Sequence, residues 1–514
     1  MSPNASALEE TVFDAVIIGS GFGGAATACA LSRAGLRTLL VERGGWAKRD
    51  DLDWNGKAIL LDGRYFGDTP LSIQQEGRAE PKDVLQNEVV GGNSIFFGGA
   101  SLRLRSNDFA AWPITYAALE PYYGAAEKLL EIHGHAGVDP CEPPRSSAYP
   151  FDAAPLSAPA QRISDAARKA GFHPFAIPLA INHAGAREPK CINCFTCDGF
   201  PCKIGAKNDV TTTALLKADQ QHLTIVPRLL ATRLRHEAGR IQSVEVVDRD
   251  TGQTLSLRAR VFVVSCGAIG TPALLLRSDL ARYDQSGSIG RYLMRHCNAM
   301  VGYVFPFRTN PDAVNHKQIC ISDLYETQRG NDGKAVGIIQ DMCMPPPEVV
   351  RQKGPPGFRW AASLAAASIQ TLICIAEDDA QADNRVHLND AVDRWGLPVV
   401  SVKHQYSAAD KERRAVLIAA ARRILREAGG MFGKVTMIES FSHAVGTVRF
   451  GASPQTAALD VNCRLNGVQN LFVADGSFMP SSGGVNPSLT ITANALRVSD
   501  RIRAEFGSLG GGAR

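Results

Sequence analysis

The stretch that decides the fold reads Phe13-Asp14-Ala15-Val16-Ile17-Ile18-Gly19-Ser20-Gly21-Phe22-Gly23-Gly24. Its first six residues suit a buried strand, and an Ala-rich helical pattern follows the glycines as far as Ala34. In such a strand–turn–helix unit, Gly19 permits the tight turn, Gly21 lets backbone approach a pyrophosphate, and Gly24 lets helix and strand pack closely. The stretch therefore predicts an α/β fold with a nucleotide site near the start of the chain.

A second predicted parallel strand, Leu36 to Val41, ends on Glu42. Glu42 stands at the spacing of the acidic residue that bonds ribose hydroxyls, so it is the expected ribose ligand. Arg43, next to Glu42, and Val226 are further candidate cofactor contacts. The glycine pattern alone does not separate FAD from NAD.

The other end of the chain carries a second nucleotide-facing pattern. Asn470 to Ser477 reads as another strand-to-loop element, and Asn486 to Thr490 precedes a helical pattern that runs to Ile502. Two such elements at opposite ends imply that the nucleotide-binding domain is assembled from separated segments.

Several stretches resemble the glucose-methanol-choline (GMC) oxidoreductase family. The C-terminal signature of that family is similar to His443–Gly451, Leu471–Ser477 and Gly484–Thr490. Ser265–Pro272 resembles its second internal signature, and Val90–Gly99 resembles its segment against the isoalloxazine ring. The resemblance implies bound FAD and an α/β fold, in which a Rossmann-like FAD-binding domain built from separated segments joins an antiparallel-sheet substrate domain.

Motif by motif, the resemblance and the nucleotide pattern together name the residues expected to contact FAD. They are Gly19, Gly21, Gly24, Glu42, Arg43, Gly92, Asn93, Ser94, Val226, Cys266, Gly267, Asp475, Gly476, Asn486, Pro487 and Ser488. In some relatives a His in the segment facing the ring is bonded covalently to FAD. No His occurs in Val90–Gly99, so we expect noncovalent FAD.

The expected FAD-binding domain comprises residues 10–110, 203–299 and 443–506, and the expected substrate domain comprises 111–202 and 300–442. β-like runs at Val301–Phe305, Val336–Met342, Thr371–Ile375 and Val399–His404 predict an antiparallel sheet over the flavin. Ala408 to Ala428 predicts an amphipathic helix. The Gly-rich tail 507–514 has too little apolar surface to offset its ordering entropy, so we expect it to be flexible.

Oxidation of an alcohol by a flavin requires a base for the hydroxyl proton, and histidine holds a proton near neutral pH. The family places a His and a second His or Asn over the flavin. By motif position these are His443, the expected base, and Asn486, a neutral donor that orients the substrate hydroxyl. His296, in a segment similar to one that closes the family's FAD domain, is interpreted as structural.

Four cysteines lie within twelve residues: Cys191, Cys194, Cys197 and Cys202. Their spacings of two, two and four approach the ferredoxin pattern without matching it. Three interpretations stay open: an iron–sulfur cluster, a structural zinc, or thiols and disulfides that hold the loop. Sugar dehydrogenases that resemble this chain carry a cluster-binding cysteine group in a similar region, whereas no second Cys-x2-Cys pair lies downstream.

Segments such as Gly205–Val210 and Trp112–Tyr116 resemble carbohydrate-oxidising members of the family, including pyranose oxidases and oxidases of aminoglycoside hydroxymethyl groups. The expected function is oxidation of an alcohol group on a sugar, glycoside or aminoglycoside-like substrate, with oxygen or an electron carrier as acceptor. The alternatives are a dehydrogenase of a non-sugar alcohol, a lyase on the same fold, and a non-enzymatic electron-transfer protein.

The composition narrows the partners. The formal net charge is +4 and basic residues form no dense run with aromatics, so we expect no nucleic-acid partner. The first ten residues lack a secretion signal, which favours a cytoplasmic enzyme. Ala361 to Ile375, the longest bland apolar stretch, is shorter than the roughly 20 residues that cross a bilayer, so we expect no membrane span.

Overall fold

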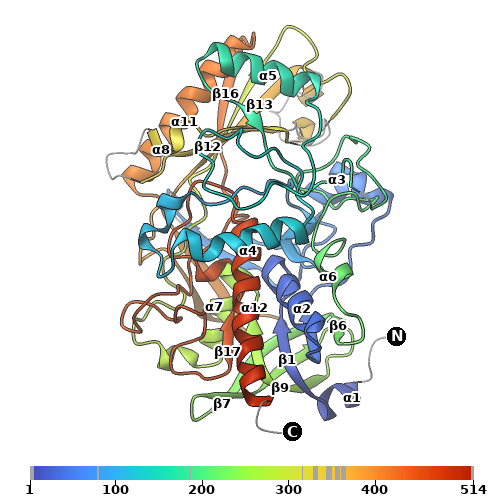
Figure 1. The fold of residues 1–514 in the computed structure, drawn as a ribbon, viewed down its shortest axis with the longest axis vertical. Helices are drawn as coiled ribbons and strands as arrows, with labels where there is room; N and C mark the ends of the chain where they lie inside the picture. Colours follow the sequence, from blue (N-terminus) through green and yellow to red (C-terminus); the bar gives the residue numbers. More distant parts are fainter. Residues whose placement is uncertain are drawn as a thin grey trace.

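The computed structural model describes residues 5–77, 80–185, 187–314, 317–327, 334–342, 350–352, 359–360 and 366–510. In these ranges the strands form a seven-stranded, a six-stranded and a four-stranded sheet. The seven-stranded sheet lies toward one end of the long axis and the six-stranded sheet toward the other (Figure 1). We call the two ends the nucleotide lobe and the roof lobe.

The nucleotide lobe is built on the seven-stranded sheet. Its strands run in the order β6 (Leu223–Pro227), β2 (Thr38–Glu42), β1 (Val12–Ile18), β9 (Thr254–Val264), β8 (Arg240–Asp248) and β7 (Leu229–Glu237), and β17 (Leu471–Val473) pairs with β9. β1 pairs in parallel with β2 and β9, and β17 pairs in parallel with β9. Strands from both ends of the chain therefore share one sheet, as the separated-segment prediction requires.

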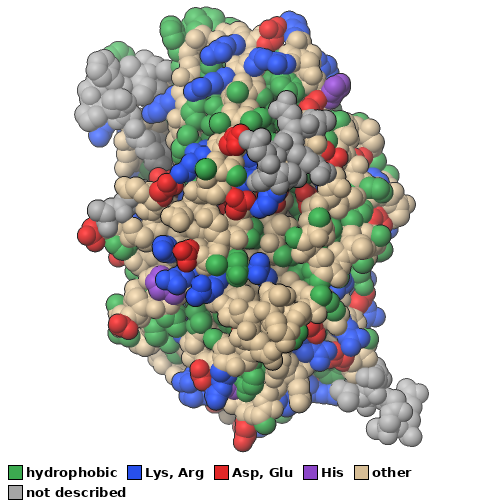
Figure 2. All heavy atoms as spheres, turned by 90° about the vertical axis from the view of Figure 1, so that its left-hand side faces the viewer, with side chains coloured by type: hydrophobic (Ala, Val, Ile, Leu, Met, Phe, Trp, Pro, Cys, Tyr) green, Lys and Arg blue, Asp and Glu red, His purple; other side chains and the backbone are tan. Residues whose placement is uncertain are grey.

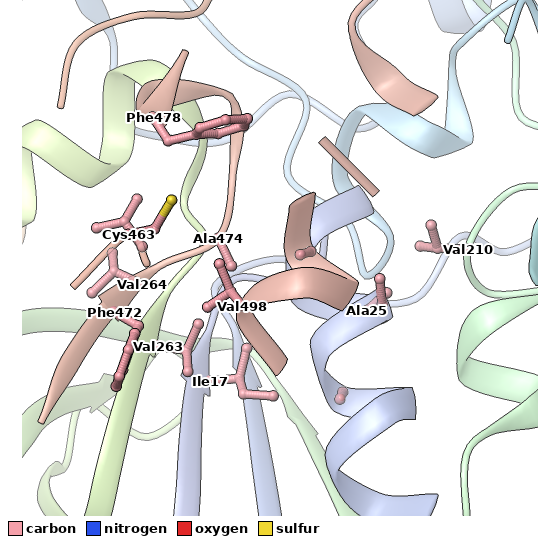
Figure 3. Packing of buried hydrophobic residues seen from close by; sticks show 14 of the residues in the cluster. Ile17, Ala25, Val210, Val263, Val264, Cys463, Phe472, Ala474, Phe478 and Val498 are labelled. Atoms are coloured by element: carbon pink, nitrogen blue, oxygen red, sulfur yellow. The ribbon is translucent and has the colours of Figure 1, made fainter. Parts of the chain in front are cut away.

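Helices cover this sheet because its strands are apolar on both faces. α2 (Phe22–Arg33) follows β1 and packs against the long C-terminal α12 (Ser488–Gly510), and α12 also contacts α4 (Tyr116–Leu129). Figure 3 shows Ile17, Val263 and Phe472, which are fully buried residues of three neighbouring strands, packed beneath Val498 of α12. α7 (Gly267–Arg277) begins directly after β9.

The roof lobe contains the antiparallel sheet that the β-like runs predict. Its order is β16 (Phe432–Met437), β10 (Ala299–Val304), β13 (Ile369–Ala376), β12 (Gly337–Met342), β11 (Ile319–Ile321) and β5 (Phe175–Ala176). α11 (Ala408–Glu427) and α5 (Ala158–Lys169) pack against each other beside it (Figure 1). Ser407 and Asp410 form a capping box before α11, which begins at the predicted Ala408 and ends one residue before the predicted Ala428.

One predicted roof strand lies elsewhere. Val399–His404 falls in β15 (Pro398–His404), which belongs to the four-stranded sheet β14 (Arg385–Val392), β15, β3 (Leu71–Gln75) and β4 (Lys82–Val84). β15 pairs in parallel with β3. Periodicity identifies a strand but not its partner, so the assignment of this strand to the roof sheet is wrong.

The domain ranges stay a prediction, and the elements of the sheets can be placed against them. Every strand of the seven-stranded sheet falls within 10–110, 203–299 or 443–506. β3 and β4, from 10–110, pair with the β14–β15 hairpin, and α4, from 111–202, buries Leu119 and Tyr123 in the nucleotide-lobe core. α12 continues through Gly510, so helix overlaps the predicted flexible tail at 507–510, and 511–514 lie outside the described residues.

The remaining short elements connect these units. They are α1 (Ala5–Glu10), η1 (Asp51–Trp54), α3 (Gly56–Leu60), η2 (Gly92–Ile95), η3 (Ser106–Ala111), α6 (Ala214–Lys217), η4 (Leu280–Tyr283), α8 (Leu324–Thr327), η5 (Ala366–Ser368) and η6 (Gly476–Phe478). None of the helices in the described ranges combines the length and apolarity that a membrane crossing requires. On the face shown in Figure 2, basic and acidic side chains are interspersed.

Candidate active site

A cavity of about 580 Å³ lies between the two lobes. Its walls come from the glycine loop after β1, the end of β2, the segment around η2, the start of α7, the roof sheet and the C-terminal signature segments. Ligand pockets in proteins commonly measure about 300 to 1,000 Å³, so the volume suits a large cofactor together with part of a substrate.

The glycine loop forms one wall of the cavity. Its backbone packs so closely against other backbone segments that side chains would not fit at most of its glycines. A Cβ on Gly19 would lie 2.4 Å from the Ser265 carbonyl oxygen, and one on Gly24 would lie 1.9 Å from the Gly19 carbonyl oxygen. A Cβ on Gly23 would lie 1.5 Å from the Ala474 carbonyl oxygen, a requirement that the sequence analysis missed. Gly21 differs, since its Cβ would meet nothing within 4 Å and would project into space beside the cavity wall.

Gly21 also precedes α2, whose first turn receives no side-chain cap. The unpaired N–H groups of a helix start attract phosphate, and the macrodipole adds to this attraction. The glycine loop, which lets a ligand come close to the backbone, and the N-terminus of α2 therefore together form the cradle that a pyrophosphate requires.

Glu42 lies at the end of β2 and lines the cavity. Its Oε2 accepts hydrogen bonds from the Ser20 amide at 3.0 Å and the Ser20 hydroxyl at 2.7 Å, and its Oε1 accepts from the Gly44 amide at 2.9 Å. These bonds occupy both lone pairs of Oε2 and one of Oε1, so Oε1 can still accept from a ribose hydroxyl. Arg43, the next residue, also lines the cavity, and its Nε lies 3.3 Å from Oε1 of Glu88.

Asp475, an expected cofactor residue on the cavity wall, also makes hydrogen bonds within the protein. Its Oδ2 accepts from the Gly267 amide at 2.9 Å and from the Thr271 hydroxyl, and its Oδ1 accepts from the Ser477 amide at 2.8 Å. Burial raises the pKa of Asp475, and these donors oppose the rise. The carboxylate thus ties the start of α7 to η6 and holds the cavity wall together. Beside it, burial raises the pKa of the Cys266 thiol to about 12.

The expected catalytic pair meets at the cavity. Nδ2 of Asn486 lies 3.3 Å from Nε2 of His443, and both residues line the cavity. Burial, then His296 and Lys317, hold the pKa of His443 well below its usual 6.5, although Asp378 opposes them. His443 is therefore neutral at neutral pH and able to accept a proton.

The neighbours of His443 determine which of its nitrogens carries hydrogen. Nε2 of His296 lies 3.3 Å from the Ser482 carbonyl oxygen, which can only accept, so this nitrogen is the donor. Burial also lowers the pKa of His296, so its ring is neutral and its Nδ1 is an acceptor. Nδ1 of His443, 2.9 Å from Nδ1 of His296, must then donate. The lone pair of His443 is left on Nε2, facing Asn486.

The structural role expected for His296 is incomplete, because its ring lies directly against that of His443. Its backbone lies at φ = 64°, in the left-handed region that is rare for a residue with a side chain. Buried Asp378 accepts from its amide at 3.1 Å, and the Tyr406 hydroxyl donates to its carbonyl at 2.8 Å. Two external bonds thus hold the strained residue that orients His443. The only signal in the sequence was the family-like segment Gly290–His296.

Most predicted cofactor residues line the cavity and a few do not. Those that line it are Gly19, Gly21, Glu42, Arg43, Gly92, Asn93, Cys266, Gly267, Asp475, Gly476, Asn486, Pro487 and Ser488. Gly24 packs helix against strand behind the loop, and Val226 lies within β6, where it pairs with Val41. Ser94 donates to the Gly91 carbonyl at 2.7 Å, which is a turn role. Near Val226, residues Leu229–Ala231 of β7 line the cavity instead.

The cysteine-rich loop reaches the cavity through other residues. Asp198 and Gly199 line it, and Oδ2 of Asp198 lies 2.8 Å from Nζ of Lys317, a second lining residue. Buried Lys207 anchors the loop, because its ammonium donates to the carbonyls of Cys197 and Phe200 and to those of Ile95 and Phe97 in the segment around η2. Lys207 therefore links the loop to that cavity wall.

The structure gives no support for a metal site at the four thiols. None of these four cysteines is in a disulfide bond, and burial raises the pKa of Cys191 to about 11, which favours the neutral thiol. Across the described ranges no group of three or more His, Cys, Asp or Glu side chains is arranged to hold a metal ion. The iron–sulfur and zinc interpretations are not supported, because sequence proximity did not bring the four sulfur atoms around one point.

The donor set fits FAD. The glycine cradle and helix start suit a pyrophosphate, Glu42 suits a ribose, and the cavity continues to a neutral histidine. Solved structures share the fold: a pyridoxine 4-oxidase from Mesorbium loti superposes with a TM-score of 0.69 at 21% identity, covering 95% of this chain and 99% of that one. A formate oxidase from Aspergillus oryzae has a TM-score of 0.66 at 15% identity, covering 98% and 100%.

Sequence comparison gives the family. Paromamine 6'-oxidase of Streptomyces fradiae is 30% identical over 97% of this chain and 92% of the relative, and 6'''-hydroxyparomomycin C oxidase of Streptomyces lividus is 31% identical over the same shares. The large subunit of fructose dehydrogenase from Gluconobacter japonicus is 26% identical over 95% and 97%. Two family models, both described as GMC oxidoreductase, match residues 13–298 and 380–495. The chain therefore belongs to the GMC oxidoreductases and is an FAD-dependent enzyme that oxidises an alcohol group.

Proposed function

We propose that the enzyme oxidises a hydroxyl group of an amino sugar or a related carbohydrate. The observation that carries the proposal is the neutral His443, whose Nε2 lone pair lies 3.3 Å from the Asn486 amide nitrogen at the cavity wall. Relatives named as oxidases of paromamine and of a paromomycin derivative support the substrate class.

His443 and Asn486 have complementary roles toward one substrate oxygen. A hydroxyl placed between them donates its proton to Nε2 of His443 while its oxygen accepts from Nδ2 of Asn486. Bound FAD supplies the acceptor for the hydride of the same carbon. His296 keeps Nδ1 of His443 engaged throughout, so the proton that His443 takes up is held at Nε2.

The wall near this pair is polar enough for a carbohydrate. Lys317 and Asp198 form a largely buried ion pair there, which offers ammonium donors and carboxylate acceptors to hydroxyl or amino groups. Met342, Ile373 and Ile438 supply apolar surface at the same end. Mixed surfaces of this kind suit the apolar faces and polar edges of sugar rings.

We further propose that FAD is held without a covalent bond and that oxygen is the first electron acceptor. Within Val90–Gly99 no His is available for a link to the flavin ring. The relatives named as oxidases favour oxygen, whereas the relative named as fructose dehydrogenase makes a carrier the competing acceptor. When the protein is precipitated with acid, yellow flavin that stays in solution supports the noncovalent assignment. A yellow protein pellet refutes it.

The deciding experiment is an anaerobic titration of the purified holoenzyme followed by its visible spectrum. Paromamine, an unmodified hexose, pyridoxine and a simple primary alcohol are added separately. Bleaching by paromamine at lower concentration than by the others supports the substrate class. Bleaching only by pyridoxine or the simple alcohol overturns it, and no bleaching by any compound overturns alcohol oxidation. Oxygen uptake against dye reduction then separates the acceptors.

A further inference from the structure

Gln340 reaches the catalytic pair from behind the cavity wall. It lies in the middle of β12, between Cys320 of β11 and Ile373 of β13, and its side chain is fully buried. Its Nε2 donates to Oδ1 of Asn486 at 2.7 Å. Asn486 is thus held on one side by Gln340 and faces His443 with its other end.

The bonds of this group run in one direction. His296 donates to the Ser482 carbonyl, His443 donates to His296, Asn486 donates to His443, and Gln340 donates to Asn486. The carbonyl of Ser482 determines the direction at one end. At the other end the amide of Asn486 could rotate by half a turn and present Oδ1 to His443, unless a donor holds Oδ1 in place.

We propose that Gln340 is a positioning residue that fixes the orientation of the Asn486 amide and so keeps a lone pair on Nε2 of His443. The inference rests on the proposed function of His443 as the base. Were Asn486 reversed, its Oδ1 would require a hydrogen on Nε2, and His443 could not accept the substrate proton in that tautomer.

The unpaired end of Gln340 supports a functional reason for the residue. Its Oε1 is buried and has no hydrogen-bond partner among the described residues. A buried unpaired oxygen destabilises a fold, and a methionine of similar size would avoid it. We infer that the glutamine is present for its Nε2, which donates the hydrogen bond to Oδ1 of Asn486.

Two variants with opposite chemistry test the proposal in the holoenzyme. Burial raises the pKa of a carboxyl at this position, so Gln340→Glu is assayed at a pH above that pKa, where the carboxylate can only accept. Asn486 then turns its Nδ2 toward residue 340 and its Oδ1 toward His443. The anaerobic rate of flavin reduction should fall about 100-fold. The added negative charge should also raise the pKa of His443, on which His296, Lys317 and Asp378 already act, and so move the acid limb of the rate profile to higher pH.

Gln340→Met removes the donor without imposing the reverse orientation. We expect a loss of about tenfold in the reduction rate, with the pH profile unmoved. Gln370→Glu is the matched control: Gln370 lies on β13 of the same sheet, is also buried, and donates to the Pro159 carbonyl at 3.0 Å away from the cavity. This control should reduce its flavin at the wild-type rate, and bound FAD and melting temperature are measured for all three.

A spectroscopic readout makes the test independent of turnover. In protein labelled with nitrogen-15 at histidine, Nε2 of His443 should give an unprotonated-nitrogen signal in the wild type and a protonated one in Gln340→Glu. Equal rate losses in both Gln340 variants with one common pH profile, or an unchanged nitrogen signal, would overturn the proposal. A wild-type flavin that no alcohol bleaches would instead defeat the proposed function, while the nitrogen signal would still report on Gln340.

Discussion

The two ends of the cavity are built on opposite principles. At the nucleotide end the glycine loop depends on the absence of side chains: a Cβ on Gly19, Gly23 or Gly24 would overlap backbone, whereas a Cβ on Gly21 would meet nothing within 4 Å. At the catalytic end the site consists of side chains, His296, His443, Asn486 and Gln340, whose hydrogen bonds must all run one way.

This difference predicts how each end fails. A glycine-to-alanine substitution in the glycine loop places a methyl group against backbone that cannot move unless the strands shift. We therefore expect such variants to lose folded protein and bound cofactor. A substitution at the catalytic end alters the positions of protons on the catalytic side chains while the cavity wall is largely preserved. We therefore expect such variants to change the reaction rate and its pH dependence. Comparison of the two classes of variant in one protein separates these outcomes.

The largest effect is expected for Gly23→Ala. The added Cβ would lie 1.5 Å from the Ala474 carbonyl oxygen, which joins the glycine loop to β17, so we expect loss of soluble, flavin-loaded protein. Gly21→Ala is the partner variant, since its Cβ meets nothing within 4 Å. It should fold and lose FAD affinity alone, as measured by the flavin-to-protein ratio and by fluorescence titration. Normal FAD loading of Gly23→Ala would contradict the claim that the nucleotide end depends on the absence of side chains in the glycine loop.

His443→Ala comes next. Loss of the base should reduce the anaerobic rate of flavin reduction about 100- to 10,000-fold, with FAD content unchanged. His222→Ala serves as control, because His222 pairs with Asp219 on the surface of the nucleotide lobe. A His443→Ala enzyme that retains its rate would refute the catalytic assignment, and one that loses its FAD would place His443 with the cofactor-retaining residues.

Lys317→Met should produce a smaller, pH-dependent effect. Lys317 helps to hold the pKa of His443 below 6.5, so its removal raises that pKa, and unpaired Asp198 raises it further. Because only the neutral base accepts a proton, kcat/KM falls as pH drops through this pKa. The acid limb should therefore move to higher pH, by about one unit. Lys317→Arg retains the charge, and an equal movement of the limb in this variant would contradict an electrostatic cause.

The smallest effect is expected from the cysteines. Cys194→Ser and Cys202→Ser change residues that do not line the cavity, so the reduction rate should stay within about twofold and stability within about 0.5 kcal/mol. The wild-type spectrum should contain flavin bands alone, and metal analysis should find neither iron nor zinc at stoichiometric levels. A shoulder beyond the flavin bands that disappears in Cys194→Ser would instead give the loop an electron-transfer role.

What the sequence could predict divides along the same line. The sequence could predict that the glycine loop, Glu42 and the pair His443–Asn486 belong to one site, because each lies in a short motif whose chemistry is local, and all of them line the same cavity. The role of Gly23 was missed because its contact, Ala474, is far along the chain. His296 precedes β10, Lys317 precedes β11 and Gln340 lies within β12, and only the fold brings them to the base.

The fold shows the same limit. Apolar periodicity predicted β10, β12, β13 and the helix α11 within a few residues. It could not predict that β15 pairs in parallel with β3, because pairing depends on segments more than 300 residues apart in the chain. Likewise the spacing of the four cysteines suggested a metal site, whereas Lys207 holds their loop through backbone carbonyls that no spacing rule describes.

The shared sheet of the nucleotide lobe also has a consequence for biosynthesis. β1 is synthesised well before residues 471–510, so its neighbour β9 acquires β17, and α2 acquires its cover α12, only after several hundred further residues have been made. Until then the early strands expose apolar surface, which makes an incomplete chain prone to aggregation. A chain that stops before β17 and α12 therefore leaves this sheet without one of its strands and one of its covering helices.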